Sequence, residues 1–187
     1  MNIALIGYGK MGKAIEEIAL QRGHKIVLKI DDENLADFTK DNVTKADVAI
    51  EFTGPHSAYN NIRGVIEFGV PVVSGSTGWT ERIDEINKIC KEKNGSFLYA
   101  SNFSVGVNIF FELNKKLASL MAPHKEYNLT MEEIHHTQKK DAPSGTAISL
   151  AEQIMGQMPQ KKKWVNYKSE KEEELSIISK REDPAPG

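Results

Sequence analysis

Three glycines near the N-terminus have the spacing of a phosphate-binding turn. Gly7, Gly9 and Gly12 fit G-x-G-x-x-G and directly follow the apolar run 2–6. In such a turn the first glycine permits a tight bend, the second lets the main chain approach a pyrophosphate, and the third allows close packing of helix on strand. Asp31 ends the next apolar run, where a carboxylate can receive ribose hydroxyls. The pattern therefore predicts a dinucleotide site.

A second stretch, between residues 133 and 146, contains side chains that could move protons. His135 and His136 are adjacent, so on a strand only one of them can share a face with Glu133. Histidine suits proton transfer near neutral pH, and Lys139 can donate a proton or hold a carboxylate. Residues 143–146 open a predicted helix whose first N–H groups can hold an anion. Taken alone, the stretch also fits exposed histidines and lysines, and its spacing provides no third ligand for a metal.

Two further loops follow apolar runs at the carboxyl ends of predicted strands. They are Gly75–Gly78 and Ala100–Phe103. Ligands of open parallel sheets bind beyond these strand ends, so small and amide-bearing residues there can approach a nicotinamide ring. The local sequence fits ordinary turns equally well.

The elements that must position these residues alternate between apolar runs and helical patterns. Strands are predicted at 2–6, 25–30, 47–52, 70–73 and 96–99. Helices are predicted after the glycine-rich turn, around Ile62 and Ile66, and over 83–90. Apolar strands separated by helices of this length build a parallel sheet covered on both faces. The first part is therefore predicted to be an α/β Rossmann domain spanning residues 1–103.

The pattern changes in residues 104–187, which we predict to form a second, α+β domain that binds the substrate. A helical period runs from 103 to 120, a strand from 127 to 136, a helix from 146 to 155 and a last strand from 175 to 179. The charge runs 161–163 and 172–174 are expected to be solvated.

Composition excludes several classes of partner. The 187 residues contain 24 Lys and Arg against 26 Asp and Glu, a formal charge of −2, so neither nucleic acid nor an anionic membrane is expected to bind. No apolar run reaches the roughly 18 residues of a membrane span, which indicates a cytoplasmic protein. The single cysteine, Cys90, falls in a helical pattern and is expected only to pack.

Four segments together resemble 4-hydroxy-tetrahydrodipicolinate reductases of bacterial lysine and diaminopimelate biosynthesis. They are Gly7–Gly12, Gly75–Gly78, the run from Ala100 through Asn-Phe-Ser-Val to Gly106, and the run from Glu133 through His-His to Asp-Ala-Pro-Ser-Gly-Thr at 141–146. The last two are highly specific in that order and spacing. The resemblance extends from residue 3 to about 181. It implies reduction of a hydroxylated cyclic dicarboxylate with NADH or NADPH by an enzyme that is usually tetrameric.

Carried over by position, the resemblance assigns roles to individual residues. His135 becomes the acid/base, Lys139 the proton donor, and the substrate contacts are His136, Gly145 and Thr146. The residues assigned to the dinucleotide are Gly7, Tyr8, Gly9, Lys10, Met11, Gly12, Asp31, Asp32, Gly75, Ser76, Thr77, Ala100, Ser101, Asn102 and Phe103.

Two departures from the family pattern matter. Many members have an arginine directly after the ribose-binding acid, where this chain has Asp32, so NADH is the expected cofactor and NADPH the alternative. Where the family commonly has Arg-x-Gly, this chain has Arg181, Glu182 and Asp183, so that loop is expected to differ. Family members also continue several tens of residues past position 187. The resemblance thus implies a C-terminally incomplete second domain. A chain that truly ended at Gly187 is expected to be inactive and prone to aggregate, and the full-length enzyme is expected to be soluble and oligomeric.

Two other classes share the glycine-rich turn. A non-catalytic dinucleotide sensor would not need His135 or Lys139. A phosphorylating semialdehyde dehydrogenase needs a nucleophilic cysteine after the nucleotide domain, and Cys90 comes too early.

Overall fold

The computed structural model describes residues 1–185, and the chain divides into two compact units. The first unit is Met1–Ser101, and the second begins at Asn102. The last two residues of the predicted substrate domain lie outside the described residues.

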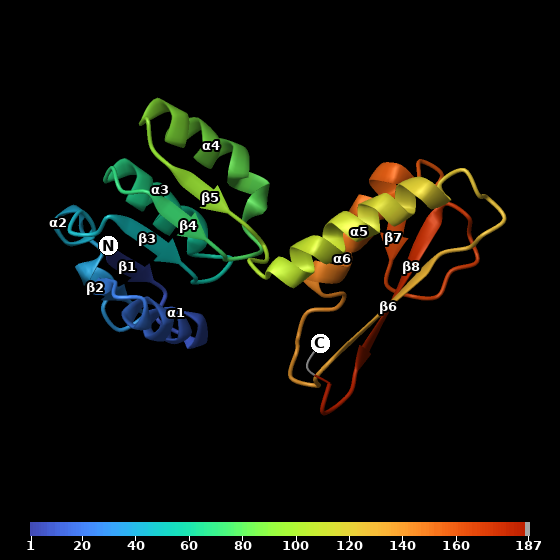
Figure 1. Ribbon diagram of the computed structural model, residues 1–187, viewed down its shortest axis with the longest axis horizontal. Helices are drawn as coiled ribbons and strands as arrows, with labels where there is room; N and C mark the ends of the chain where they lie inside the picture. The colour runs from blue at the N-terminus through green and yellow to red at the C-terminus, as the bar shows by residue number, and fades with distance from the viewer. Residues whose placement is uncertain (186–187) are drawn as a thin grey trace. The chain divides into compact units, whose positions relative to one another are not determined.

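The first unit is a five-stranded parallel sheet with helices between the strands. Its strands are β1 (Asn2–Ile6), β2 (Lys25–Ile30), β3 (Val48–Glu51), β4 (Val72–Ser74) and β5 (Phe97–Tyr99), in the order β2-β1-β3-β4-β5 (Figure 1). The connections contain α1 (Lys10–Gln21), α2 (Lys40–Val43), α3 (Ala58–Glu67), α4 (Ile83–Glu92) and the 3₁₀ turns η1 (Leu35–Asp37) and η2 (Thr80–Arg82). The predicted Rossmann architecture is confirmed.

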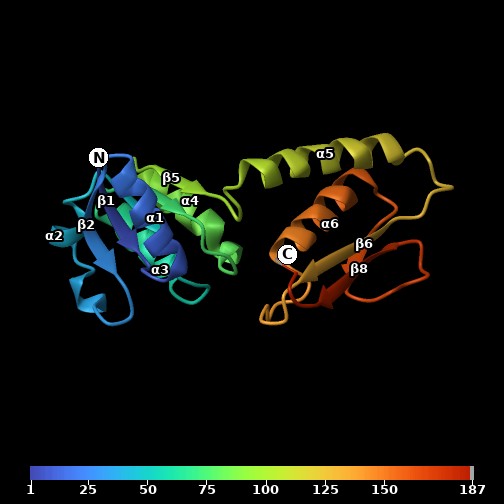
Figure 2. The same cartoon turned by 60° about the horizontal axis from the view of Figure 1, so that its bottom comes forward.

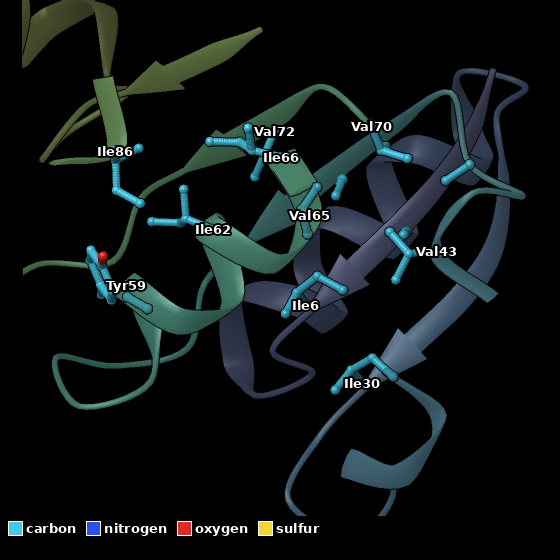
Figure 3. Packing of buried hydrophobic residues seen from close by; sticks show 14 of the residues in the cluster. Ile6, Ile30, Val43, Tyr59, Ile62, Val65, Ile66, Val70, Val72 and Ile86 are labelled. Carbon is cyan, nitrogen blue, oxygen red and sulfur yellow. The ribbon is translucent and has the colours of Figure 1, made fainter. Parts of the chain in front are cut away.

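Alternation along β1 divides the core between the two faces of this sheet. Ile3 and Leu5 pack with α1 on one face. Ala4 and Ile6 face the other way, into a larger cluster with α2, α3 and α4. Figure 3 shows Ile6 in this cluster, together with residues such as Ile62, Ile66 and Ile86. Cys90 packs against the same cluster from α4, as the sequence predicts.

The second unit has a three-stranded parallel sheet covered by two helices. The strands are β6 (Thr130–His135), β7 (Lys163–Val165) and β8 (Glu174–Arg181), in the order β6-β8-β7, and the helices are α5 (Val105–Met121) and α6 (Gly145–Gln157). Figure 2 shows α6 lying between α5 and the strands. Ala118 of α5, Ala151 of α6 and Leu175 of β8 share the core of this unit.

The prediction that both charge runs are solvated is wrong at two residues. Lys161 and Glu174 are buried, and Lys163 belongs to the unpredicted strand β7. Lys161 Nζ donates to the Glu174 carbonyl oxygen at 3.1 Å, while Lys163 Nζ lies 3.1 Å from the Glu174 carboxylate. Ser169 donates to that carboxylate and, with Lys163, lowers the pKa of Glu174 to about 2. Burial is tolerated because each charge has a partner.

The outer face of α5 carries exposed apolar side chains, among them Ile109, Leu113 and Leu117. These residues follow one another at four-residue spacing, so they form a stripe along the helix. Of the helices in residues 1–185, none has both the length and the apolar character needed to cross a membrane.

Candidate active site

The strand order of the first unit opens a crevice where β1 and β3 end. The chain runs from β1 to β2 on one side and then returns past β1 to β3, β4 and β5 on the other. Connections therefore leave the carboxyl ends of β1 and β3 in opposite directions, which is the topological switch point where open α/β sheets bind ligands. The predicted glycine-rich turn lies there, between β1 and α1.

Two glycines of this turn are required by close main-chain packing. Gly7 has φ of +100°, and a Cβ there would lie 2.1 Å from the Phe52 carbonyl oxygen. A Cβ on Gly12 would lie 2.3 Å from the Gly7 carbonyl oxygen. At Gly9, by contrast, a Cβ would have no neighbour within 4 Å in the described residues 1–185. The middle glycine therefore faces open space, as close approach of a ligand to the main chain requires.

A cavity of about 620 Å³ lies beside the turn, within the usual range for ligand sites. Predicted residues that line it are Gly7, Tyr8, Gly9, Asp31 and Asp32, and further lining residues include Glu33, Thr53 and Asn61. Asp31 is fixed by a local turn, since its Oδ1 accepts the Glu33 N–H at 2.9 Å. Glu33, which the sequence analysis did not single out, adds a third carboxylate to this end of the cavity.

A second cavity of about 360 Å³ shares Gly9 with the first and reaches the loop after β4. Its lining includes Lys10, Met11, Gly75, Ser76 and Thr77, all of which the sequence assigns to the dinucleotide. Within the described part of the chain, Ala100–Phe103 line neither of these two cavities. Ala100 and Ser101 end the first unit, and Asn102 and Phe103 begin the second.

A fully buried carboxylate, which the sequence analysis missed, ties the strand ends together. Glu51 ends β3 and accepts hydrogen bonds from Ser74 Oγ at 2.6 Å, Ser76 Oγ at 2.8 Å and the Thr53 N–H at 2.9 Å. Thr53 Oγ1 donates to it as well. Thr53 and Ser76 both line the second cavity, so Glu51 fixes two of its walls.

The second unit brings His135 against a carboxylate of the same strand. His135 Nδ1 contacts Glu133 Oε2, two residues earlier on β6. Because an ionised carboxylate only accepts, Nδ1 is the donor. Burial opposes ionisation of Glu133, but hydrogen bonds from Ser179, Arg181 and His135 outweigh it and lower its pKa.

Lys139 lies in the loop that follows β6. Its Nζ donates to Asp141 Oδ1 at 2.8 Å, and this bond lowers the pKa of Asp141. Arg181, at the end of β8, donates to the main-chain oxygens of Lys139 and Asp141. Asp183 holds the same loop, because it accepts the Thr137 N–H at 3.1 Å. The segment that departs from the family pattern therefore anchors the loop of Lys139.

The helix predicted to open at residues 143–146 is present. Gly145 and Thr146 are the first residues of α6, where N–H groups have no intrahelical acceptor. Ser144 caps the helix by accepting the Ala147 N–H at 3.2 Å, and its own N–H donates to Glu133 at 3.3 Å. His136 comes directly after β6, which is shorter than predicted, so the two-face argument does not apply to it.

A Rossmann unit with a crevice beside a glycine-rich turn, followed by a unit in which a histidine and a lysine each pair with a carboxylate, is the arrangement of a nicotinamide-dependent oxidoreductase. Residues 1–103 match the family model for the N-terminus of dihydrodipicolinate reductase, and residues 106–187 match the model for its C-terminus. The chain belongs to the dihydrodipicolinate reductase family, which acts in the diaminopimelate route to lysine.

Similar proteins agree with this assignment. The 4-hydroxy-tetrahydrodipicolinate reductase of Christiangramia forsetii is 49% identical over 191 residues, covering 100% of this chain and 77% of the relative. A dipicolinate-bound dihydrodipicolinate reductase from Paenisporosarcina sp. TG-14 superposes with a TM-score of 0.67 at 26% identity, covering 100% of this chain and 79% of that one. Aspartate semialdehyde dehydrogenase II of Vibrio cholerae is 10% identical with a TM-score of 0.52, covering 100% and 69%, and shares the fold alone.

Proposed function

We propose that this chain carries out its family's reduction of 4-hydroxy-tetrahydrodipicolinate to tetrahydrodipicolinate with His135 as acid/base and Lys139 as proton donor. The observation that carries the proposal is the contact of His135 Nδ1 with Glu133. It leaves Nε2 as the ring nitrogen available to exchange a proton with a substrate. Neither a sensor nor a semialdehyde dehydrogenase needs this arrangement.

The first unit is proposed to be the dinucleotide-binding domain. The two cavities that meet at Gly9 suit a long, bent ligand whose pyrophosphate lies on the turn and on the N-terminus of α1. Among residues 1–185, no side chain caps that helix end, so its first N–H groups can bind phosphate. The nicotinamide, when bound, supplies the hydride. Ser76 and Thr77 are proposed to hold its ring end, together with Ala100–Phe103.

The second unit is proposed to bind the dicarboxylate substrate. The N–H groups of Gly145 and Thr146, at the positive end of α6, suit a carboxylate, and Lys139 and His136 supply further donors. The reductase from Paenisporosarcina sp. TG-14 is bound to dipicolinate, a cyclic dicarboxylate. A ligand of the same shape and charge is expected to bind here.

NADH is the proposed cofactor, with NADPH as a poorer alternative. Asp31, Asp32 and Glu33 line the same end of the larger cavity. One carboxylate can accept both ribose hydroxyls, whereas three would repel a 2′-phosphate. In an exposed site each repulsion is limited to about 1 kcal/mol, so the preference is moderate.

Assembly and location follow the family resemblance. We propose a homotetramer that works in the cytoplasm. The exposed apolar stripe on α5, with Ile109, Leu113 and Leu117, is the kind of surface that packs against another chain.

The test replaces the two proposed proton-transfer groups separately. His135→Ala and Lys139→Ala should each lower kcat by at least about 10²-fold, because a general acid or base contributes about 10²–10⁴ in rate. The melting temperature and the affinity for NADH should stay close to those of the unmodified chain. Steady-state turnover of the cyclic precursor measures kcat. Near-full kcat in either variant would show that the role of that residue is wrongly assigned.

A further inference from the structure

One carboxylate of the second unit contacts two parts of the proposed substrate site, His135 and the start of α6. The Glu133 side chain is only 9% exposed. Its Oε2 binds His135 Nδ1, and its Oε1 accepts from Arg181 Nη1 at 3.0 Å and from the Ser144 N–H at 3.3 Å. It thus joins the histidine, the start of α6 and a residue of β8.

The arginine on that carboxylate extends the connection to Lys139. Arg181 Nε donates to the Lys139 carbonyl oxygen at 3.3 Å, and Nη2 donates to the Asp141 carbonyl oxygen. These two carbonyls belong to the loop in which Lys139 Nζ pairs with Asp141. A planar guanidinium with five N–H donors can span all three acceptors, and an ammonium group cannot.

We propose that Glu133 and Arg181 are positioning residues for the reaction: Glu133 fixes the tautomer and ring orientation of His135, and Arg181 fixes Glu133 and the main chain that carries Lys139. This inference rests on the proposed roles of His135 and Lys139. A carboxylate on one ring nitrogen determines which nitrogen carries a proton and where the other points. The lowered pKa of Glu133 keeps that carboxylate ionised.

A double-mutant cycle separates positioning from simple structural support. Glu133→Gln keeps the size of the side chain but removes its charge. It should lower kcat by about 10–100-fold, as loss of a group that orients a functional histidine commonly does, while leaving KM for NADH within about twofold. Combined with His135→Ala, it should slow the enzyme no further, because its effect acts through that ring. Arg181→Lys should lower kcat with the same unchanged KM.

A matched control lies on the same two strands. Glu132 pairs with Lys180 at 2.8 Å, and both side chains are exposed. Glu132→Gln removes the same charge one residue away and should leave kcat unchanged. Thermal melting checks that every variant is folded. If Glu133→Gln does not fold, the kcat of the Arg181→Lys variant tests the positioning role instead.

The outcomes distinguish this inference from the proposed function. A slow His135→Ala variant beside a folded Glu133→Gln variant with normal kcat would overturn the positioning role alone. Losses that multiply in the double variant would overturn it too. A His135→Ala variant with normal kcat would overturn the proposed function and the inference together. Normal kcat in the Arg181→Lys variant would show that Arg181 is not a positioning residue.

Discussion

The crevice of the first unit and the site of the second unit are held by different interactions. Around the crevice, the shape is set by strand order and by glycines whose main chains touch neighbouring carbonyl groups, as at Gly7 and Gly12. Around His135, the shape is set by side-chain charges, with Glu133 and Arg181 at the centre. An added methyl group should therefore damage the first site, and removal of a charge should damage the second.

The largest effect is expected from Gly7→Ala. The new Cβ would lie 2.1 Å from the Phe52 carbonyl oxygen at a φ of +100°, so clash and strain together should cost roughly 3 kcal/mol or more of unfolding free energy. Gly9→Ala is the matched variant, because its Cβ has no neighbour within 4 Å in the part of the chain that the structure describes. It should melt normally but bind NADH about tenfold more weakly, since it blocks approach to the main chain. Melting curves compare the stability of the two variants, and NADH titrations compare their affinity for the cofactor. Equal behaviour of the two variants would contradict the packing argument.

A charge change at the rim of the crevice should alter which cofactor is used. We expect a preference for NADH over NADPH in kcat/KM of several-fold to about a hundredfold, from repulsions of about 1 kcal/mol each. Asp32→Arg should move the ratio toward NADPH, because it replaces repulsion of a 2′-phosphate by attraction. Both cofactors are compared at one ionic strength. Equal or better use of NADPH by the unmodified chain would refute the proposal.

Glu51 provides an exception within the first unit, since there a charge supports the crevice. Glu51→Gln should weaken NADH binding several-fold, because the amide keeps only one acceptor oxygen and turns an NH₂ donor toward groups that now donate to the carboxylate. It should cost about 1–3 kcal/mol of unfolding free energy. The affinity for ADP, which lacks the nicotinamide half, should fall less, because Thr53 lines both cavities but Ser76 only the second. Titration with both ligands tests this, with the exposed Glu81→Gln as control. Equal losses of affinity for NADH and for ADP would show that Glu51 does not act through the second cavity.

The sequence predicts those parts of the fold that local pattern controls. β1 and β2 match the predicted ranges 2–6 and 25–30, because each is a continuous apolar run that ends at a residue of different character, Gly7 or Asp31. β7 was missed. Its first residue, Lys163, is the last of the charge run 161–163, and the pairing of its three residues depends on β8, which lies farther along the chain.

The same limit applies to the candidate sites. The glycine-rich turn and Asp31 are recognisable because their spacing is local. Glu51 is not, since its acceptor role depends on Ser74 and Ser76, which follow 23 and 25 residues later. Arg181 reaches Glu133 across 48 residues, and only the pairing of β6 with β8 brings them together. A buried charge at the end of an apolar strand run was the available signal for Glu51.

Hydrogen exchange of the full chain, measured with and without saturating NADH, tests most directly that the crevice of the first unit binds the dinucleotide. We expect slower exchange at main-chain amides in 7–12, 31–33, 52–54 and 75–77, which surround the two cavities. Amides of 130–135, on β6, should keep their rates. Slower exchange confined to the second unit, with none around Gly7–Gly12, would contradict the account.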